Sequence, residues 1–242
     1  MTEQQIINEA YALLEQDSTL WATTDDEYST ARAFFNMGVG RWETYMNTTW
    51  HELWTTLADA ASSLGGDTST VAGTSAYDCP SNFVRPGGYV TTSASTATST
   101  NTFWTVIQPE QVAALGNSDD YFCWFTGNNK TGFDLHFNPR ITLTTGQTID
   151  YPYYKAATTS SATSTVPEMG DPHYLSYFIA AHMSEEGVDA DFFNMSEEKL
   201  DAMRTVNMSG VWGNPFQIDD FSDGFGDVSA TNISSTNQTG RP

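Results

Sequence analysis

The residue types that could carry chemistry are few in this sequence, and they do not form a catalytic pattern. The glycine-rich element 38–41 (Gly-Val-Gly-Arg) lacks the Lys-Ser/Thr pair of a phosphate-binding loop, so we expect no nucleotide site there. Cys79 and Cys123 are the only cysteines, and we expect two reduced thiols. The four histidines lack the paired spacing of metal ligands, so we expect them to pack in a core or an interface: His51, His136, His173 and His182.

Adjacent acidic residues are the remaining candidates for chemistry. Glycoside hydrolases use two carboxylates, and the sequence has acidic pairs at Asp119-Asp120, Glu185-Glu186 and Asp219-Asp220. Such pairs are much more common on a solvated turn or helix face than in an active site. We therefore expect a protein that is not an enzyme and that binds no cofactor and no metal.

Composition excludes several classes of protein. The chain has 242 residues, 30 Asp and Glu against 9 Lys and Arg, and a formal net charge of −21. A nucleic-acid reader needs a basic face to neutralise phosphates, so this charge argues against one. Aromatic residues make up 13% of the chain, which argues against disorder. Because only 16% of the residues are charged, the acidity comes mainly from the scarcity of lysine.

The N-terminus and the lengths of the apolar runs indicate where in the cell the protein is expected. The polar N-terminus has neither the basic nor the apolar region of a secretory signal, and no run approaches about 18 apolar residues. We therefore expect no membrane segment, and assembly in a cytoplasm.

Helical periodicity is clear at the start of the chain. Apolar residues recur on one face over 3–16, which predicts a helix. A capping box at residues 24–27 and an apolar stripe from Ala31 to Leu64, which ends at the Gly65-Gly66 stop, predict a long second helix. Gly38, Gly40 and residues 47–49 weaken its middle, where we expect a bend or break. Two such helices form half of a four-helix bundle.

The middle of the chain changes to short apolar segments separated by turn residues. We predict strands at 103–107, 121–125, 132–137 and 149–154. The Ser/Thr-rich segment 91–102 is compatible with either a loop or a strand. These features predict a β domain.

Helical spacing returns near the end. Asp171-Pro172 is a typical helix start, and a further helix is expected from Ser196 through Val206. We therefore predict an α+β fold: about four helices in a bundle, an inserted antiparallel β domain, and an extended C-terminal tail. The predicted boundaries are 1–66 and 161–209 for the helices, 67–160 for the β domain and 210–242 for the tail.

Three stretches together resemble the head-to-tail adaptor proteins of tailed phages, particularly the podovirus tail tubular protein A, or gatekeeper-ring, type. The first is residues 6–14 with the acidic helix start at 25–28. The second is 77–85, which is similar to the family's Y-x-L-P-x-D-F motif, with Cys79 in place of Leu and Asn82 in place of Asp. The third comprises 149–155, 166–169 and 171–175. The resemblance covers roughly residues 3–186 and lies in the order of the elements.

The resemblance implies a structural protein of the virion neck. Such adaptors form a ring, typically of twelve copies, that joins the portal protein to the tail, nozzle or stopper protein and lines the DNA exit channel. The passing double-stranded DNA would be surrounded without specific binding. The charge of −21 fits that role, and it fits equally a need for solubility or a saline host.

Two sets of residues are candidates for this role. The aromatic-rich tail is predicted to contact the portal or a neighbouring subunit through Trp212, Phe216, Ile218, Phe221 and Phe225. The candidate channel-lining acids are Asp119, Asp120, Glu185, Glu186, Asp189 and Asp191. Two alternatives stay open: another virion part (tail-tube, stopper or head-decoration protein), and a carbohydrate-binding module or glycosidase suggested by seven Trp residues.

Overall fold

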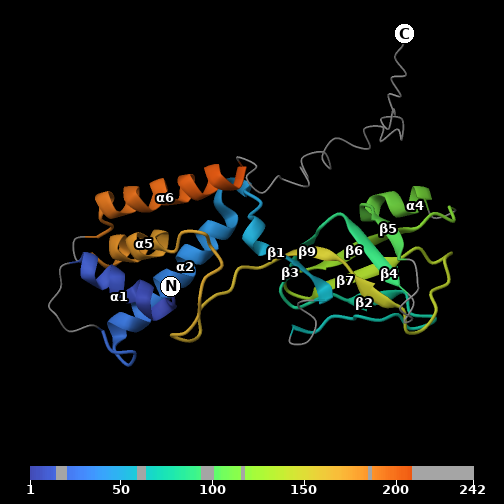
Figure 1. The fold of residues 1–242 in the computed structure, drawn as a ribbon, viewed down its shortest axis with the longest axis horizontal. Coiled ribbons are helices and arrows are strands. Elements are labelled where there is room, and N and C mark those ends of the chain that lie inside the picture. The colour runs from blue at the N-terminus through green and yellow to red at the C-terminus, as the bar shows by residue number, and fades with distance from the viewer. Residues whose placement is uncertain (15–20, 59–63, 94–100, 116–117, 185–186, 209–242) are drawn as a thin grey trace, which may run out of the picture.

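The fold is mixed α+β in the computed structural model, which describes residues 1–14, 21–58, 64–93, 101–115, 118–184 and 187–208 (Figure 1). The α-helices are α1 (Glu3–Leu13), α2 (Asp26–Thr44), α4 (Val112–Leu115), α5 (His173–Met183) and α6 (Ala190–Met208). The 3₁₀ turns are η1 (Tyr45–Asn47), η2 (His51–Leu53) and η3 (Pro109–Gln111). The strands are β1 (Trp54–Thr56), β2 (Ala76–Asp78), β3 (Phe83–Pro86), β4 (Tyr89–Ser93), β5 (Thr102–Val106), β6 (Phe122–Asn128), β7 (Gly132–Phe137), β8 (Thr148–Asp150) and β9 (Pro152–Lys155).

The long helices from both ends of the described chain lie together at one side of the molecule (Figure 1). Helix α5 packs against α1, α2 and α6. Its apolar residues are buried almost all round, as expected for a central helix, whereas the other three bury one face. The predicted stripe of the first helix is confirmed, because Ile6, Ile7 and Ala10 are fully buried.

The strands form two sheets around a second core. The larger sheet has the order β2-β7-β6-β5-β4-β8, and the smaller has the order β1-β9-β3. Every pairing is antiparallel except that of β5 with β6, which is parallel. The expectation of a purely antiparallel β domain is therefore wrong at this pair. The β5–β6 connection carries η3 and α4, and a crossover of that length brings the chain back in the same direction.

The second helix is shorter than predicted. It ends at Thr44, and β1 occupies residues 54–56, so a helix continuing to residue 64 is wrong. The expected break near residues 47–49 does occur: Met46 and Asn47 take positive φ angles of 46° and 55°. The chain then turns back, and the indole Nε1 of Trp50 donates to the carbonyl of Trp42 at 2.6 Å. This tertiary contact overrides the helical spacing of the apolar residues that follow.

The other predicted elements need smaller corrections. The four predicted strands all exist, the last one divided into β8 and β9. Residues 91–93 belong to β4, while 94–100 lie outside the described residues. Helix α5 begins at His173, directly after the predicted Asp171-Pro172 start, and the Asp171 carboxylate accepts the His173 N–H at 3.1 Å. Helix α6 begins at residue 190, not at 196, because Asp189 caps its first turn by accepting from the Asp191 and Phe192 N–H groups.

Close packing of α2 on α5 depends on one glycine. A Cβ at Gly38 would lie 2.7 Å from Leu175 Cδ2 and 3.0 Å from Phe178 Cδ1. At Gly40, one half-turn further along the same helix, a Cβ would meet nothing within 4 Å. The packing of α2 on α5 therefore requires glycine at position 38, whereas the space around Gly40 would accept a side chain.

We predict opposite effects of alanine at these two positions. Gly40→Ala should stabilise the fold by roughly 0.5–1 kcal/mol, because alanine favours the helix. Gly38→Ala should destabilise it by about 1 kcal/mol or more, because overpacking outweighs the same gain. Urea unfolding followed by far-UV circular dichroism measures both, and an equal stabilisation by the two variants would contradict the packing.

Candidate functional site

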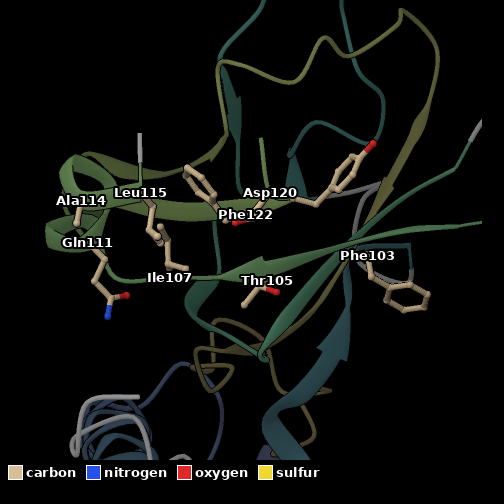
Figure 2. Close-up of a pocket in the computed structure, with 9 residues that line it drawn as sticks. Phe103, Thr105, Ile107, Gln111, Ala114, Leu115, Asp120 and Phe122 are labelled. Atoms are coloured by element: carbon tan, nitrogen blue, oxygen red, sulfur yellow. The ribbon is translucent and has the colours of Figure 1, made fainter. Parts of the chain in front are cut away.

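A concavity lies on the outer face of the larger sheet. An open pocket of about 690 Å³ is lined by β5, the η3–α4 crossover and the start of β6 (Figure 2). This volume falls within the range of small-ligand and anchor pockets. Its walls are mostly apolar, with a few polar side chains: Phe103, Thr105, Ile107, Gln111, Ala114, Leu115, Asp120, Tyr121 and Phe122.

Strand alternation creates this site. In β5, Trp104 points into the core and is 1% exposed, so its neighbours Phe103 and Thr105 point outward. Phe103 is 65% exposed and contacts the ring of Tyr89 on β4, with 6.1 Å between centroids. Tyr121 is 50% exposed, and its ring lies edge-on to Trp104 at 5.1 Å. Two rings that line the pocket, those of Phe103 and Tyr121, are therefore largely exposed to solvent.

Local hydrogen bonds fix the two segments that flank the pocket. At η3, Gln108 and Gln111 form a reciprocal capping box, and Pro109 takes the first position of the turn. On the other side, the buried Asn138 amide donates to the carbonyls of Ser118 and Asp120 at 3.0 and 2.8 Å. The crossover and the start of β6 are thus held at defined positions.

The predicted channel-lining acids fall into two separate groups. Asp119 and Asp120 lie beside the pocket, where Asp119 pairs with Arg140 at 2.8 Å and Asp120 accepts from the Ser118 hydroxyl. Asp189 and Asp191 lie at the start of α6, at the opposite end of the molecule (Figure 1). Glu185 and Glu186 are outside the described residues, as are Trp212, Phe216, Ile218, Phe221 and Phe225.

Most of the scarce cations are held by carboxylates of the same chain. Of the nine Lys and Arg residues, Arg241 lies outside the described part. Five others form ion pairs at 2.8 to 2.9 Å: Arg32 with Glu3, Arg41 with Glu197, Arg140 with Asp119, Lys155 with Glu168, and Lys199 with Asp171. Few positive charges are therefore left to attract a phosphate backbone.

The four histidines contact neighbouring side chains, and the two cysteines are free, buried thiols. His136 stacks on Trp124 at 5.2 Å, and the ring of His182 packs on Phe178 at 4.3 Å. His173 contacts Glu9, and His51 contacts Glu52. Within the described ranges, no three His, Cys, Asp or Glu side chains are grouped so that they could hold a metal ion.

Sequence reasoning missed the pocket. Phe103, Tyr121 and Phe122 lie in short aromatic strands, where the same residue types usually form core. The only available signal was that Phe103 is next to the inward-facing Trp104, so one of the two had to face outward. Only the pairing of the strands in the sheet shows that Phe103 is the residue that faces outward.

The comparisons with known proteins leave the family open. No protein-family model matches the chain, and no curated protein matches it significantly. Among the described helices, none has the length and apolar character needed to cross a membrane.

We predict that both thiols are inert in the folded protein. Burial raises the pKa of Cys79 to about 12, with further increases from nearby carboxylates such as Asp134, and burial also raises the pKa of Cys123. Because the thiolate is the reactive form, iodoacetamide at pH 8 should alkylate the native chain at least about 100-fold more slowly than the urea-unfolded chain. Mass spectrometry of timed samples measures both rates, and rapid labelling of the native chain would contradict the burial.

Proposed function

We propose that this protein is a structural adaptor of a tailed-phage neck, which forms a ring between the portal and the tail. The supporting observation is the arrangement of the chain. Helices α1 and α2 from its beginning and α5 and α6 from its end share one core, and the strands between residues 54 and 155 form a second core. A helical bundle with an inserted β domain is the layout that the sequence resemblance implies.

A closed ring requires two different faces on each subunit. Head-to-tail contacts are heterologous, so one surface of each copy binds another surface of the next. We propose that the tail, residues 210–242, contributes to one such contact or to portal binding through its aromatic residues. The ring would be a virion part with no enzymatic activity.

The charge distribution also supports the proposal. DNA passing through a ring must slide, and free Lys and Arg side chains would retain it through phosphate contacts. Here a net charge of −21 is combined with ion pairs that occupy five of the cations. A channel lined by such a surface would repel the duplex.

The alternative virion roles remain compatible with an α+β fold, because a fold does not determine a function. A tail-tube, stopper or head-decoration protein would assemble without the portal. A carbohydrate-binding role has less support from tryptophan, since Trp42, Trp50 and Trp104 are at most 1% exposed.

Co-expression with the portal protein encoded in the same genome tests the adaptor proposal. We expect a ring of about twelve copies attached to the portal, visible by negative-stain electron microscopy and countable by native mass spectrometry. Since subunits of −21 repel one another, ring occupancy should rise as salt screens that charge. A portal ring with no bound copies of this chain at any ionic strength would disprove the proposal.

Charge reversal tests whether acidic residues face the DNA. Asp119 and Asp189 are poor targets, because one binds Arg140 and the other caps α6. Asp191 is exposed in the first turn of α6, and Glu27 is exposed in the first turn of α2, so lysine at either carries a similar helix-dipole cost.

We expect Asp191→Lys to slow genome ejection, most strongly at low salt, and Glu27→Lys to leave the rate unchanged. Single-particle fluorescence of DNA release from assembled virions measures the rate. Equal rates for Asp191→Lys and wild type at every salt concentration would remove Asp191 from the channel.

A further inference from the structure

The outer face of the larger sheet carries an exposed aromatic pair that the fold does not need for its own core. The pair consists of Tyr89 and Phe103, which are 40% and 65% exposed and whose ring centroids lie 6.1 Å apart. Exposed aromatic residues grouped around a concavity are typical of interaction sites, whereas single exposed apolar residues are ordinary. The pocket described above is lined by Phe103 of this pair at one end and by Leu115 of α4 at the other (Figure 2).

The floor of the pocket is apolar and suits an inserted side chain. Ile107 and Phe122 are largely buried, and Leu115 of α4 closes one end (Figure 2). Two rings of the lining have aromatic neighbours: Phe103 contacts Tyr89, and Tyr121 packs edge-on to Trp104. Rigid aromatic walls lose little side-chain entropy when a partner binds, which favours a pocket for one apolar anchor.

Acidic residues adjoin the pocket. Asp120 is one of its lining residues, and Glu110 and Asp119 are the chain neighbours of the lining residues Gln111 and Asp120, all three with exposed side chains. Arg140 pairs with Asp119 and offsets one of these charges. A positively charged partner would therefore be attracted, and its cations could also lie over the exposed rings.

We propose that this pocket binds a basic segment of another protein, in which one aromatic or aliphatic anchor is flanked by Lys or Arg. Charge complementarity favours this occupant over two alternatives, the C-terminal segment of the same chain and a second copy of the chain, because both are acidic. The C-terminal segment carries Asp219, Asp220, Asp223 and Asp227 against Arg241, and a second copy brings a net charge of −21. The site does not depend on the ring, and it would serve any of the virion roles above.

The test uses the full chain and three short fluorescent peptides. The basic Trp peptide has a central Trp, and on each side of it Gly, Ser and two Lys residues. The Ser peptide is the same except that Ser replaces Trp. The acidic Trp peptide keeps Trp and has Glu in place of every Lys. Fluorescence anisotropy gives the affinity at low and at physiological ionic strength. We expect the basic Trp peptide to bind at least about tenfold more tightly than either of the others.

Matched variants locate the binding. Phe103→Ala should weaken the basic Trp peptide about tenfold or more, whereas Met195→Ala, which removes an exposed apolar side chain from α6, should not. Glu110→Gln combined with Asp120→Asn should weaken binding and flatten its salt dependence. Glu27→Gln combined with Glu198→Gln removes two exposed carboxylates elsewhere and should have little effect. Unchanged circular dichroism spectra verify that the variants fold.

Several results would overturn the proposal. Equal binding of the Trp and Ser peptides would show general attraction to an acidic protein. Equal binding of the acidic Trp peptide would show that the acidic residues beside the pocket do not select charge. Displacement of the basic peptide by a synthetic peptide of residues 209–228, or altered self-association of Phe103→Ala in native mass spectrometry, would assign the pocket to this chain's own tail or to a second copy. A failure of ring formation on the portal, by contrast, would leave these affinities unaffected.

Discussion

The alternation of side chains along β9 joins the two cores of this protein. Tyr153 is fully buried in the sheet core, where it stacks on Phe83 at 5.5 Å and its hydroxyl contacts Asn82. Tyr154, the next residue, faces the helix core, packs edge-on to Trp54 and lies under the Arg85 guanidinium at 4.6 Å. Because neighbouring residues of a strand point to opposite sides, a strand of four residues anchors both cores. A slip of one residue would exchange the two tyrosines and disrupt both.

A buried carboxylate strengthens the helical side of this junction. Glu3 is fully buried, pairs with Arg32 of α2 at 2.8 Å, and accepts from the Ser160 hydroxyl. It therefore ties α1 to α2 and to the segment that follows β9. A buried charge is tolerated only when it is paired and hydrogen-bonded, so these contacts constrain one another. The same pairing gives the partly exposed Arg32 guanidinium a carboxylate partner within the chain.

The sequence-based predictions were correct where the interactions are local in sequence and wrong where they depend on tertiary contacts. The helix at the start was predicted well because its buried face is a local repeat, and the start of α5 was predicted because Asp171-Pro172 directly precedes it in sequence. The prediction that the second helix continues past Thr44 was wrong because Trp50 packs back on Trp42. The periodicity of apolar residues carries no information about such a contact. The pocket was missed for a related reason: aromatic strand residues have the same pattern whether they face a core or solvent.

The sequence by itself determined the charge of −21, the α+β composition, and most helix and strand positions, because composition is additive and amphipathic patterns are local. Only the tertiary structure decided the parallel pairing of β5 with β6 and the pairing of Arg41 with Glu197, 156 residues apart in sequence. It also decided which aromatic rings of β5 stand in solvent. These outcomes depend on which distant segments meet, and that choice follows from the simultaneous burial of both cores.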